Sequence, residues 1–489
     1  MFCVILVSSS LLMLWAPSAR KTRSGAIFAA WTGEVSTIQS TAFNIAPLLL
    51  EALAVERDDQ EDSEPDDALN DIDDAWPLPP RPDPWNEVDD LPPAPEQCAS
   101  PNRKRCASPT YDCLVATGTL LSGPHRRRAA KRVRTIASKG HVPRASTIRE
   151  HVATAKPTCI PTFDASGLPS ARGAYVAVVE QKAEKYGRKK QRSVAELIGL
   201  GFQLVQWDGI SARPLSDNAG RIFAVLAGQP DNREWHASVS RAYDFIKQEG
   251  VAADFPTYMR RHRRGLFAAI NVGLSHGKGL TAPTWLDAKE YTPLRQALLF
   301  FLTLFLILPV SAAFGLWAPR LHAYYVDHNA QLGARLPHLW RPFPKSVFAC
   351  AAFNFGNSVW TFKHRDVCNL PFGWCAIQSM GKFDATKGSH LVLWDLKLVV
   401  EFPAGALILL PSATIAHSNV PVQAGDERIS FTQFTAGGIF RWLDHGGRTE
   451  AELADEDPDE HARQMALKEA RWEAGLRLWS TIDELLDHK

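Results

Sequence analysis

Two histidines and an aspartate in the C-terminal half of the chain have the composition of a mononuclear iron site. His364 and Asp366 lie two positions apart, and His417 follows 53 residues after His364. Two histidines and one carboxylate form the facial triad that holds Fe(II) and leaves positions open for a cosubstrate and dioxygen. Because residues i and i+2 of an extended segment point to the same side, His364 and Asp366 can face one metal while Arg365 points away.

An arginine and a serine downstream of these ligands could bind an organic acid beside the metal. Arg428 lies 11 residues past His417, and a hairpin through Gly425 would bring it back toward the site. A guanidinium group can hold a carboxylate through two hydrogen bonds, and Ser430, on the same strand face, can donate another. Both residues suit the distal carboxylate of 2-oxoglutarate, whose other end would chelate iron. In the alternative interpretation the histidines are structural and Arg428 forms a surface ion pair.

The residues between 346 and 433 have the pattern of a β-sandwich or jelly roll. Short apolar runs alternate there with glycine and proline turns every eight to twelve residues. In such a fold His417 would arrive on a strand of the opposing sheet. Upstream, the spacing of apolar residues predicts a helix and strand over 193–206, a strand over 222–226 and a helix over 235–249. The predicted fold class is α+β, with a double-stranded β-helix (jelly-roll) core and flanking helices.

Composition divides the chain into four predicted parts. With 489 residues, of which 45% are hydrophobic and 22% are charged, a wholly disordered or fibrous protein is excluded. Over 56–95, however, acidic residues give way to prolines, and such a composition cannot bury enough apolar surface to fold. The predicted parts are a disordered N-terminal region over 1–158, a supporting part of the catalytic domain over 159–320, the jelly-roll core over 321–445 and a charged C-terminal helix over 446–489.

Positive charges gather in local clusters although the total charge is nearly balanced. The 54 Lys and Arg residues oppose 53 Asp and Glu residues, so any contact with a polyanion must be local. Clusters at 103–105 and 126–134 resemble a bipartite nuclear import signal and predict a protein of the nucleus. Further clusters at 188–192 and 260–264 could line a groove for nucleic acid. Alternatively, these arginines and lysines are ordinary solvated surface residues.

An uncharged stretch over 297–318 is long enough to cross a bilayer. Pro309 lies within it, and the strand patterns on its C-terminal side are those of a soluble domain. We therefore expect a buried helix and no membrane, while a spanning helix and an insertion foreign to the fold stay open as alternatives. The apolar leader at 2–15 is a poor secretory signal, because no basic residue precedes it.

The sequence around the candidate ligands resembles the TET/JBP-type Fe(II)- and 2-oxoglutarate-dependent dioxygenases, in the form that has multiplied in mushroom-forming (basidiomycete) fungi. The resemblance implies oxidation of the methyl group of 5-methylcytosine in DNA to 5-hydroxymethylcytosine, with the formyl and carboxyl forms left open as further products. It also implies that the target base is extruded from the duplex. The matching segments are 359–366, Asn369, 372–375, 388–402, 411–421 and 431–442, within a weaker similarity over 200–445.

The resemblance assigns a role to each candidate residue by its position. Asn369 matches the place where the family contacts the cytosine edge, which suits an amide because it can both donate and accept hydrogen bonds. Some relatives have a base-contacting histidine eight residues after the 2-oxoglutarate arginine, whereas this chain has Ala436. Carried over in the same way, the iron ligands would be His364, Asp366 and His417, and the 2-oxoglutarate residues would be Arg428, Ser430 and Asn354.

Two other functions share the same candidate iron core. The enzyme could hydroxylate a protein or a small molecule, in which case the basic clusters would be incidental. The chain could also be a catalytically inactive, transposon-associated relic that binds DNA. The main prediction is a monomeric nuclear enzyme that requires Fe(II), 2-oxoglutarate and O2 and acts on DNA containing 5-methylcytosine.

Overall fold

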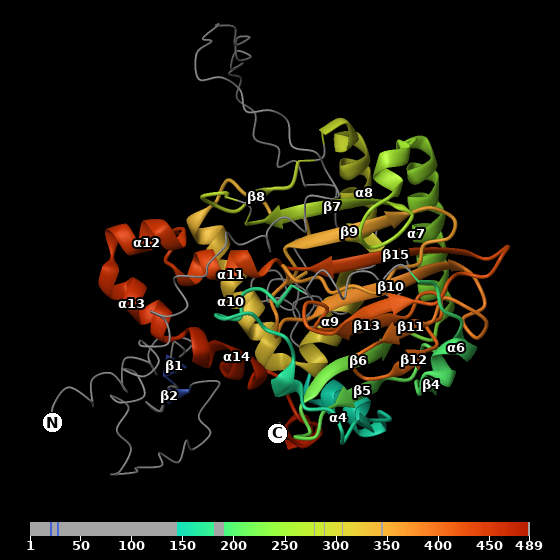
Figure 1. Cartoon of the computed structure of the whole chain (residues 1–489), viewed down its shortest axis with the longest axis horizontal. Helices are drawn as coiled ribbons and strands as arrows, with labels where there is room; N and C mark the ends of the chain where they lie inside the picture. The colour runs from blue at the N-terminus through green and yellow to red at the C-terminus, as the bar shows by residue number, and fades with distance from the viewer. Residues whose placement is uncertain are drawn as a thin grey trace, which may run out of the picture. The chain divides into compact units, whose positions relative to one another are not determined.

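A computed structural model gives the architecture of the chain, which divides into two compact units, Met1–Asp66 and Asp67–Lys489 (Figure 1). In the first unit the described residues form one antiparallel strand pair, β1 (Arg20–Lys21) and β2 (Ile27–Phe28). The second unit contains the candidate site. The structure describes residues 20–21, 27–28, 144–179, 190–277, 279–287, 289–305, 307–343 and 346–487.

The folded part of the chain begins earlier than the sequence predicts. Helix α4 (Ala145–Thr154) lies inside the region that was expected to be disordered over 1–158. Its Ile148 and Val152 are buried in the main hydrophobic core, and their position four residues apart places both side chains on one face of the helix. The predicted boundary is therefore corrected to a point before α4. Both clusters of the predicted import signal lie outside the described residues.

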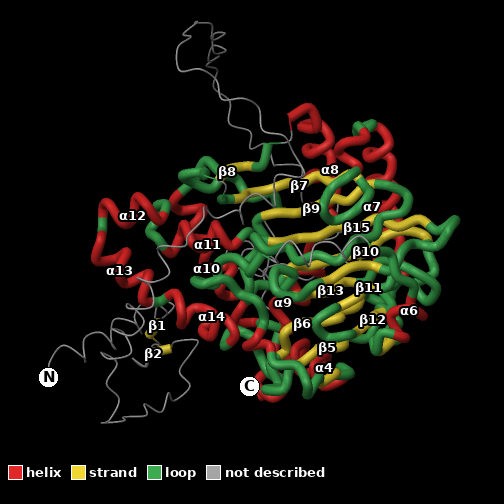
Figure 2. The backbone as a smooth tube through the Cα atoms, in the orientation of Figure 1, coloured by secondary structure: helices red, strands yellow, loops and turns green. Residues whose placement is uncertain are grey.

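A nine-stranded sheet forms the centre of the second unit (Figures 1 and 2). Its strands are β3 (Thr158–Cys159), β5 (Arg213–Ser216), β6 (Ile222–Gly228), β7 (Ala268–Ser275), β8 (Thr284–Trp285), β9 (Cys350–Phe355), β10 (Cys375–Lys382), β13 (Leu407–Leu410) and β15 (Glu427–Phe434). The strand order is β3-β5-β6-β13-β10-β15-β9-β7-β8. Neighbours are antiparallel except β3 and β5. Because β15 lies between β10 and β9, Arg428 and Ser430 sit on an interior strand.

A second, four-stranded sheet has the order β14-β11-β12-β4. Its strands are β4 (Gln203–Val205), β11 (Leu391–Leu393), β12 (Leu398–Val400) and β14 (His417–Asn419). Alternate residues of β11 enter two different cores: Leu391 and Leu393 join the main core, whereas Val392 packs with Leu197 and Phe202 on the other face. The main core also contains side chains of β10 and β13, so the two sheets share one hydrophobic interior.

Helices cover the sheets and complete a mixed α+β fold, as the sequence predicts at the level of fold class. The predicted helix and strand over 193–206 are confirmed as α6 and β4, and the hairpin strand over 222–226 is confirmed as β6. Helix α7, predicted over 235–249, packs against β9 and β10. Further helices of the second unit are α6 (Val194–Gly199), α7 (Arg233–Ala252), α8 (Thr292–Phe305), α9 (Ile307–Trp317), α10 (Pro319–Arg335) and α11 (Gly437–Asp444).

The apolar stretch over 297–318 contains the end of α8 and the whole of α9. Leu298 of α8 and Phe314 of α9 are fully buried in two core clusters. Among the described residues, no helix is both long enough and apolar enough to span a membrane.

Replacing Phe314 with alanine tests whether this stretch belongs to the core. The Phe314 ring is 0% exposed and stacks on Phe348 and Trp374, with ring centroids 5.4 and 5.5 Å away. Losing such a ring should lower the free energy of unfolding by about 3–5 kcal/mol. Urea titration measures the change, and Tyr258→Ala, at a side chain that is 60% exposed, should cost less than about 0.5 kcal/mol. Equal effects of the two substitutions would show that the stretch is not part of the core.

The C-terminal region predicted as one charged helix over 446–489 consists of four short helices in the structure. Asp457 has a non-helical backbone and caps the second of them by accepting a hydrogen bond from the N–H of Glu460, and Pro458 then occupies the first turn. Trp479 is 1% exposed and its indole donates to the carbonyl of Phe372 at 2.9 Å, so the region is anchored in the core. The helices are α12 (Glu450–Glu456), α13 (Pro458–Ala466), α14 (Lys468–Leu476) and α15 (Ile482–Asp487).

Candidate metal centre

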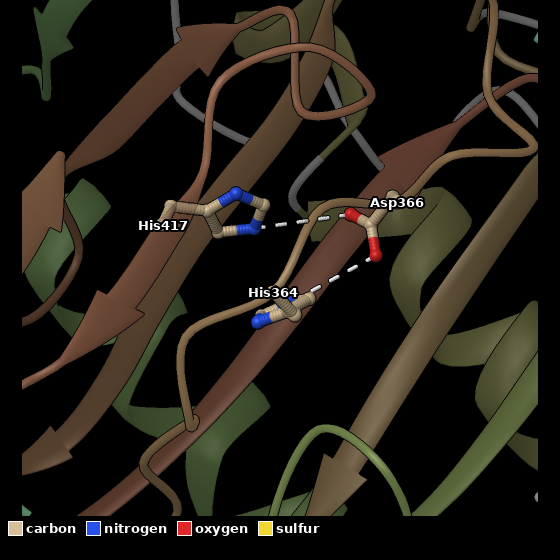
Figure 3. A group of neighbouring side chains, drawn as sticks. All are labelled: His364, Asp366 and His417. Carbon is tan, nitrogen blue, oxygen red and sulfur yellow. Dashed lines mark ion pairs between the residues drawn. The ribbon is translucent and has the colours of Figure 1, made fainter. Parts of the chain in front are cut away.

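Three of the predicted residues converge on one point (Figure 3). Asp366 Oδ1 lies 3.7 Å from His364 Nε2, and Asp366 Oδ2 lies 3.9 Å from His417 Nε2. One ligand atom from each residue lies within 4.8 Å of the others. Within the part of the chain that the structure describes, this is the only group of three or more His, Cys, Asp or Glu residues that could hold a metal ion.

Backbone hydrogen bonds hold the two histidines side by side. The N–H of His364 donates to the carbonyl of His417 at 3.0 Å, and the N–H of His417 donates to the carbonyl of His364 at 2.9 Å. His417 begins β14, so the segment that carries His364 extends the edge of the four-stranded sheet. The expectation that His417 arrives from the sheet opposite His364 is therefore wrong, because both histidines lie on one sheet edge.

The aspartate and the intervening arginine lie as the i and i+2 spacing predicts. The N–H of Asp366 donates to the carbonyl of Ser412 at 2.9 Å, which fixes the turn that carries its carboxylate to His364. Arg365 points away from the triad, where its Nε donates to the carbonyl of Thr414 at 2.9 Å and its Nη2 pairs with Asp395 at 2.7 Å. The prediction that His364 and Asp366 share a side and Arg365 does not is confirmed.

Each imidazole presents its Nε2 atom to the centre of the triad in the form that a metal requires. His364 Nδ1 lies 2.8 Å from the carbonyl of Phe362, and His417 Nδ1 lies 2.9 Å from the carbonyl of Ile415. Because a carbonyl oxygen can only accept, each Nδ1 must carry the hydrogen and donate it. In the neutral ring, Nε2 then keeps its lone pair and is ready to coordinate a cation.

Burial and charge favour neutral histidines beside an ionised aspartate. Burial lowers the pKa of His417, and burial together with repulsion between the two imidazolium forms lowers the pKa of His364. For Asp366, burial alone would raise the pKa, but electrostatic interaction with the two histidines and with the guanidinium groups of Arg264 and Arg263 lowers it to about 2. Two neutral imidazoles and one carboxylate form the donor set expected for Fe(II).

The cluster at 260–264, for which the sequence leaves a nucleic-acid groove and a solvated surface open, brings Arg263 and Arg264 against the loop that carries the candidate metal ligands. Arg263 Nη1 lies 3.2 Å from the carbonyl of Arg365, and the backbone carbonyl of Arg264 accepts from the N–H of Phe362 at 2.8 Å. Sequence patterns alone missed this role. The run of basic residues was the only signal in the sequence. The fold brings it to the ligand loop, because Arg263 and Arg365 are in contact although 102 positions separate them in the sequence.

Arg428 is a buried cation rather than a member of a surface ion pair. It is 1% exposed, its Nη1 donates to the carbonyl of Val359 at 2.7 Å, and its guanidinium lies 5.8 Å from the Phe402 ring centroid. Its Nε has no hydrogen-bond partner, and no carboxylate pairs with it among the described residues. Burial lowers the pKa of Arg428 to about 10. An unpaired buried guanidinium is costly, so this position is suited to an anionic ligand.

Ser430 and Asn354 lie next to each other across β15 and β9, close to Arg428 along β15. They are paired in register, and Asn354 Nδ2 donates to Ser430 Oγ at 2.8 Å. Asn354 is 4% exposed, and its Oδ1 has no partner among the described residues. The structure thus brings together all three residues that the resemblance assigns to 2-oxoglutarate, although their contact with that molecule stays a prediction.

Two further buried polar residues near β11 were not predicted. Ser389 and His390 are 1% and 0% exposed, and the Ser389 hydroxyl and both His390 ring nitrogens lack hydrogen-bond partners among the described residues. The backbone carbonyl of His390 accepts from the N–H of Val420, which follows β14 directly. A Ser-His pair in front of an apolar strand is too common to have been recognised from the sequence.

Stability should fall as the pH is lowered from about 7 to about 5. Burial lowers the pKa of His390 and His445 to about 4 in the folded protein, from a usual 6.5. Between those values the unfolded chain binds protons that the folded chain does not, so each group costs up to about 1.4 kcal/mol per pH unit. Urea titration across this range measures the slope, and His390→Phe should flatten it. A stability that rises as the pH falls would contradict the burial of these imidazoles.

Asn369 and Ala436, the two positions tied to base contact by the resemblance, pair in an isolated antiparallel bridge. The N–H of Asn369 donates to the carbonyl of Asp366 at 2.9 Å, and its side-chain amide lies 3.2 Å from Ser412 Oγ. Both positions therefore border the loop that carries the metal ligands. Contact of Asn369 with a cytosine stays a prediction.

No protein-family model matches the chain, and no curated protein matches it. Among solved structures, one described as "NgTET1 in complex with 5mC DNA" aligns with 48% of this chain and 83% of that chain, at 14% sequence identity and a TM-score of 0.34. So low a TM-score does not establish a shared fold. The geometry of the site is therefore the main evidence for a function.

Proposed function

We propose that the chain is an Fe(II)- and 2-oxoglutarate-dependent dioxygenase. The observation that supports this most directly is the convergence of His364, Asp366 and His417, with both Nε2 atoms left free to coordinate by their Nδ1 hydrogen bonds. When bound, Fe(II) would supply the dioxygen chemistry that side chains alone cannot perform. The protein's own contribution would be to fix three ligands on one side and to keep the centre dry, since both histidines are 4% exposed.

We also propose that the two sheets form the double-stranded β-helix of such enzymes. The support is their shared interior, in which side chains of β10 and β13 pack with those of β11 and β12. The metal ligands lie on the edge of the smaller sheet, while Arg428 and Ser430 lie on an interior strand of the larger one. The segment from Val359 to His364 connects them, because Val359 accepts from Arg428 and His364 pairs with His417.

In this proposal Arg428 binds the distal carboxylate of 2-oxoglutarate, with Ser430 and Asn354 beside it. The buried guanidinium has an unused Nε donor, and Asn354 has an unused Oδ1 acceptor. A carboxylate would accept a hydrogen bond directly from Arg428 Nε. A hydroxyl group or a water molecule would donate to Asn354 Oδ1. Because the cation is desolvated before the ligand arrives, this contact should dominate cosubstrate affinity and orient the acid toward the metal ligands.

The proposed substrate is 5-methylcytosine in DNA, oxidised to 5-hydroxymethylcytosine and with further oxidation left open. The sequence resemblance supports it, as does the position of Asn369 beside the metal-ligand loop. An amide at this place could donate to and accept from the edge of an extruded cytosine. A nuclear, monomeric enzyme with DNA as its partner belongs to the same proposal.

Succinate formation measured with and without methylated DNA tests this function. The purified chain is supplied with Fe(II), 2-oxoglutarate and O2, and duplexes that differ only in cytosine methylation are compared. We expect the methylated duplex to accelerate succinate formation. Equal rates with both duplexes would indicate that the substrate is a protein or a small molecule. Metal binding without any turnover would identify an inactive DNA-binding relic.

A further inference from the structure

The sheet edge that carries the metal ligands has a second face with its own cluster of side chains. The segment at 361–364 pairs with β14, since the N–H of Asn419 donates to the carbonyl of Thr361 at 3.0 Å and His364 pairs with His417. Successive residues of paired extended segments point to opposite faces. His364 and His417 therefore point toward the metal centre, while Lys363 and its neighbour in register, Ser418, point to the outer face.

Contacts on the outer face confirm this alternation. The indole N–H of Trp394 donates to Ser418 Oγ at 2.9 Å, and Lys363 Nζ lies 5.0 Å from the centroid of the same indole ring. Arg192 also approaches this ring, with its Cζ 5.9 Å from the centroid. Lys190 and Trp360 line the same shallow depression in the surface. We call this surface the outer groove and define it by Lys190, Arg192, Trp360, Lys363, Trp394 and Ser418.

The outer groove carries a net positive charge among the described residues. Among the described residues, none of its three cations forms an ion pair, and the indole N–H of Trp360 has no acceptor. The N–H of Ser193 donates to the Glu196 carboxylate at 2.7 Å and lowers its pKa, to which Lys190 and Arg192 contribute, so Glu196 offsets one of the three positive charges. Asp395 is likewise engaged, by Arg365 at 2.7 Å. A net positive charge beside half-buried indole rings remains.

We propose that the outer groove binds the nucleic-acid strand that flanks the nucleotide presented to the metal centre. Unpaired cations attract phosphates, and exposed aromatic faces stack with bases whatever their sequence. Trp360 is the stacking candidate, because Trp394 is already covered by Lys363 and Arg192. This inference rests on the proposed function, because the strand in question is the one that flanks the nucleotide at the metal centre. It also gives the basic run at 188–192 a role, since Lys190 and Arg192 belong to it.

Fluorescence anisotropy with a labelled duplex containing 5-methylcytosine, and with the corresponding single strand, tests the proposal. The full chain is compared with Lys190→Gln/Arg192→Gln, with Lys363→Gln and with Trp360→Ala. Each lost phosphate contact should reduce the slope of log K against log salt by about 0.9 on the duplex. Trp360→Ala should weaken single-strand binding by roughly 5- to 150-fold, the equivalent of one lost base stack.

Two controls separate binding from folding. Arg477→Gln removes an equally charged side chain that is 66% exposed and pairs with Glu473 elsewhere, and it should leave both the affinity and the salt slope unchanged. Lys363→Arg keeps the charge and should retain binding, which distinguishes a lost contact from a disturbed fold. Groove variants that bind both oligonucleotides with wild-type affinity and salt slope would overturn the proposal, as would a wild-type chain that binds neither.

Repeating the titrations in a His364→Ala background separates this inference from the proposed function. If the groove is correct, its substitutions weaken DNA binding to the same extent with and without the metal ligand. Loss of binding in groove variants of a chain that never forms 5-hydroxymethylcytosine would uphold the groove and reject the substrate chemistry. Product formation by the wild type together with groove variants of unchanged affinity would uphold the chemistry and reject the groove.

Discussion

Replacing His364 with alanine should abolish divalent metal binding and, with it, all turnover. The side chain is 4% exposed and supplies one of three candidate ligand atoms that lie within 4.8 Å of one another, and no other His, Cys, Asp or Glu of the described residues belongs to this group. Removing only an outer-shell partner of a metal ligand typically costs 10- to 100-fold in affinity, so loss of the ligand itself should cost more than about 100-fold. Calorimetric titration with Fe(II) under anaerobic conditions, or absorbance titration with Co(II), measures the effect directly.

His236→Ala is the matched control for this substitution. The His236 side chain is 49% exposed on α7 and lies 3.9 Å from Asp231, and it is not part of the candidate metal group among the described residues. Its loss should leave metal affinity unchanged. If His364→Ala and His236→Ala bound metal equally well, His364 would be a structural histidine and the assignment of the metal centre would be wrong.

Replacing Arg428 with methionine should raise the Kd for 2-oxoglutarate by roughly 30- to 5,000-fold while leaving metal affinity nearly unchanged. That range corresponds to the 2–5 kcal/mol typically lost when one partner of a buried, hydrogen-bonded charge pair is truncated. The reason lies in the environment of the guanidinium, which is 1% exposed and has no described carboxylate partner. Calorimetric titration of the metal-loaded protein with 2-oxoglutarate measures the change.

The same substitution should not destabilise the protein when 2-oxoglutarate is absent. A buried charge that lacks a partner carries an uncompensated desolvation cost, and an apolar side chain of similar volume removes that cost. Thermal unfolding should therefore show a similar or higher Tm for Arg428→Met without the acid, and a Tm that no longer rises when the acid is added. Arg477→Met, at an exposed side chain, is the control. A large drop in Tm with unchanged 2-oxoglutarate affinity would make Arg428 a structural residue.

The convergence of the candidate metal ligands was predictable because their geometry is largely local. The alternation of an extended segment places His364 and Asp366 on one side, and the structure confirms that Arg365 turns away to Thr414 and Asp395. The distant ligand was identifiable by its residue type and by the strand pattern before it. Its placement was not, because pairing of the His364 segment with β14 depends on backbone hydrogen bonds that no side-chain pattern encodes.

Features that depend on contacts between remote segments were missed. Arg263 and Arg264 reach the ligand loop through a strand order in which β7 and β9 are neighbours, whereas the run of basic residues alone suggested either a groove for nucleic acid or a solvated surface. The burial of Arg428 likewise follows from the interior position of β15. The prediction of a single C-terminal helix was wrong for a local reason, because an Asp-Pro pair at 457–458 ends one helix and caps the next.

The most direct test of the proposed function is nucleoside mass spectrometry of a 5-methylcytosine duplex after incubation with the full chain, Fe(II), 2-oxoglutarate and O2. The same incubation with His364→Ala is the control for adventitious iron. We predict 5-hydroxymethylcytosine with the native chain and none with the variant. A duplex that stays fully unmodified while the native chain binds metal and converts 2-oxoglutarate to succinate would contradict the assignment of DNA as the substrate.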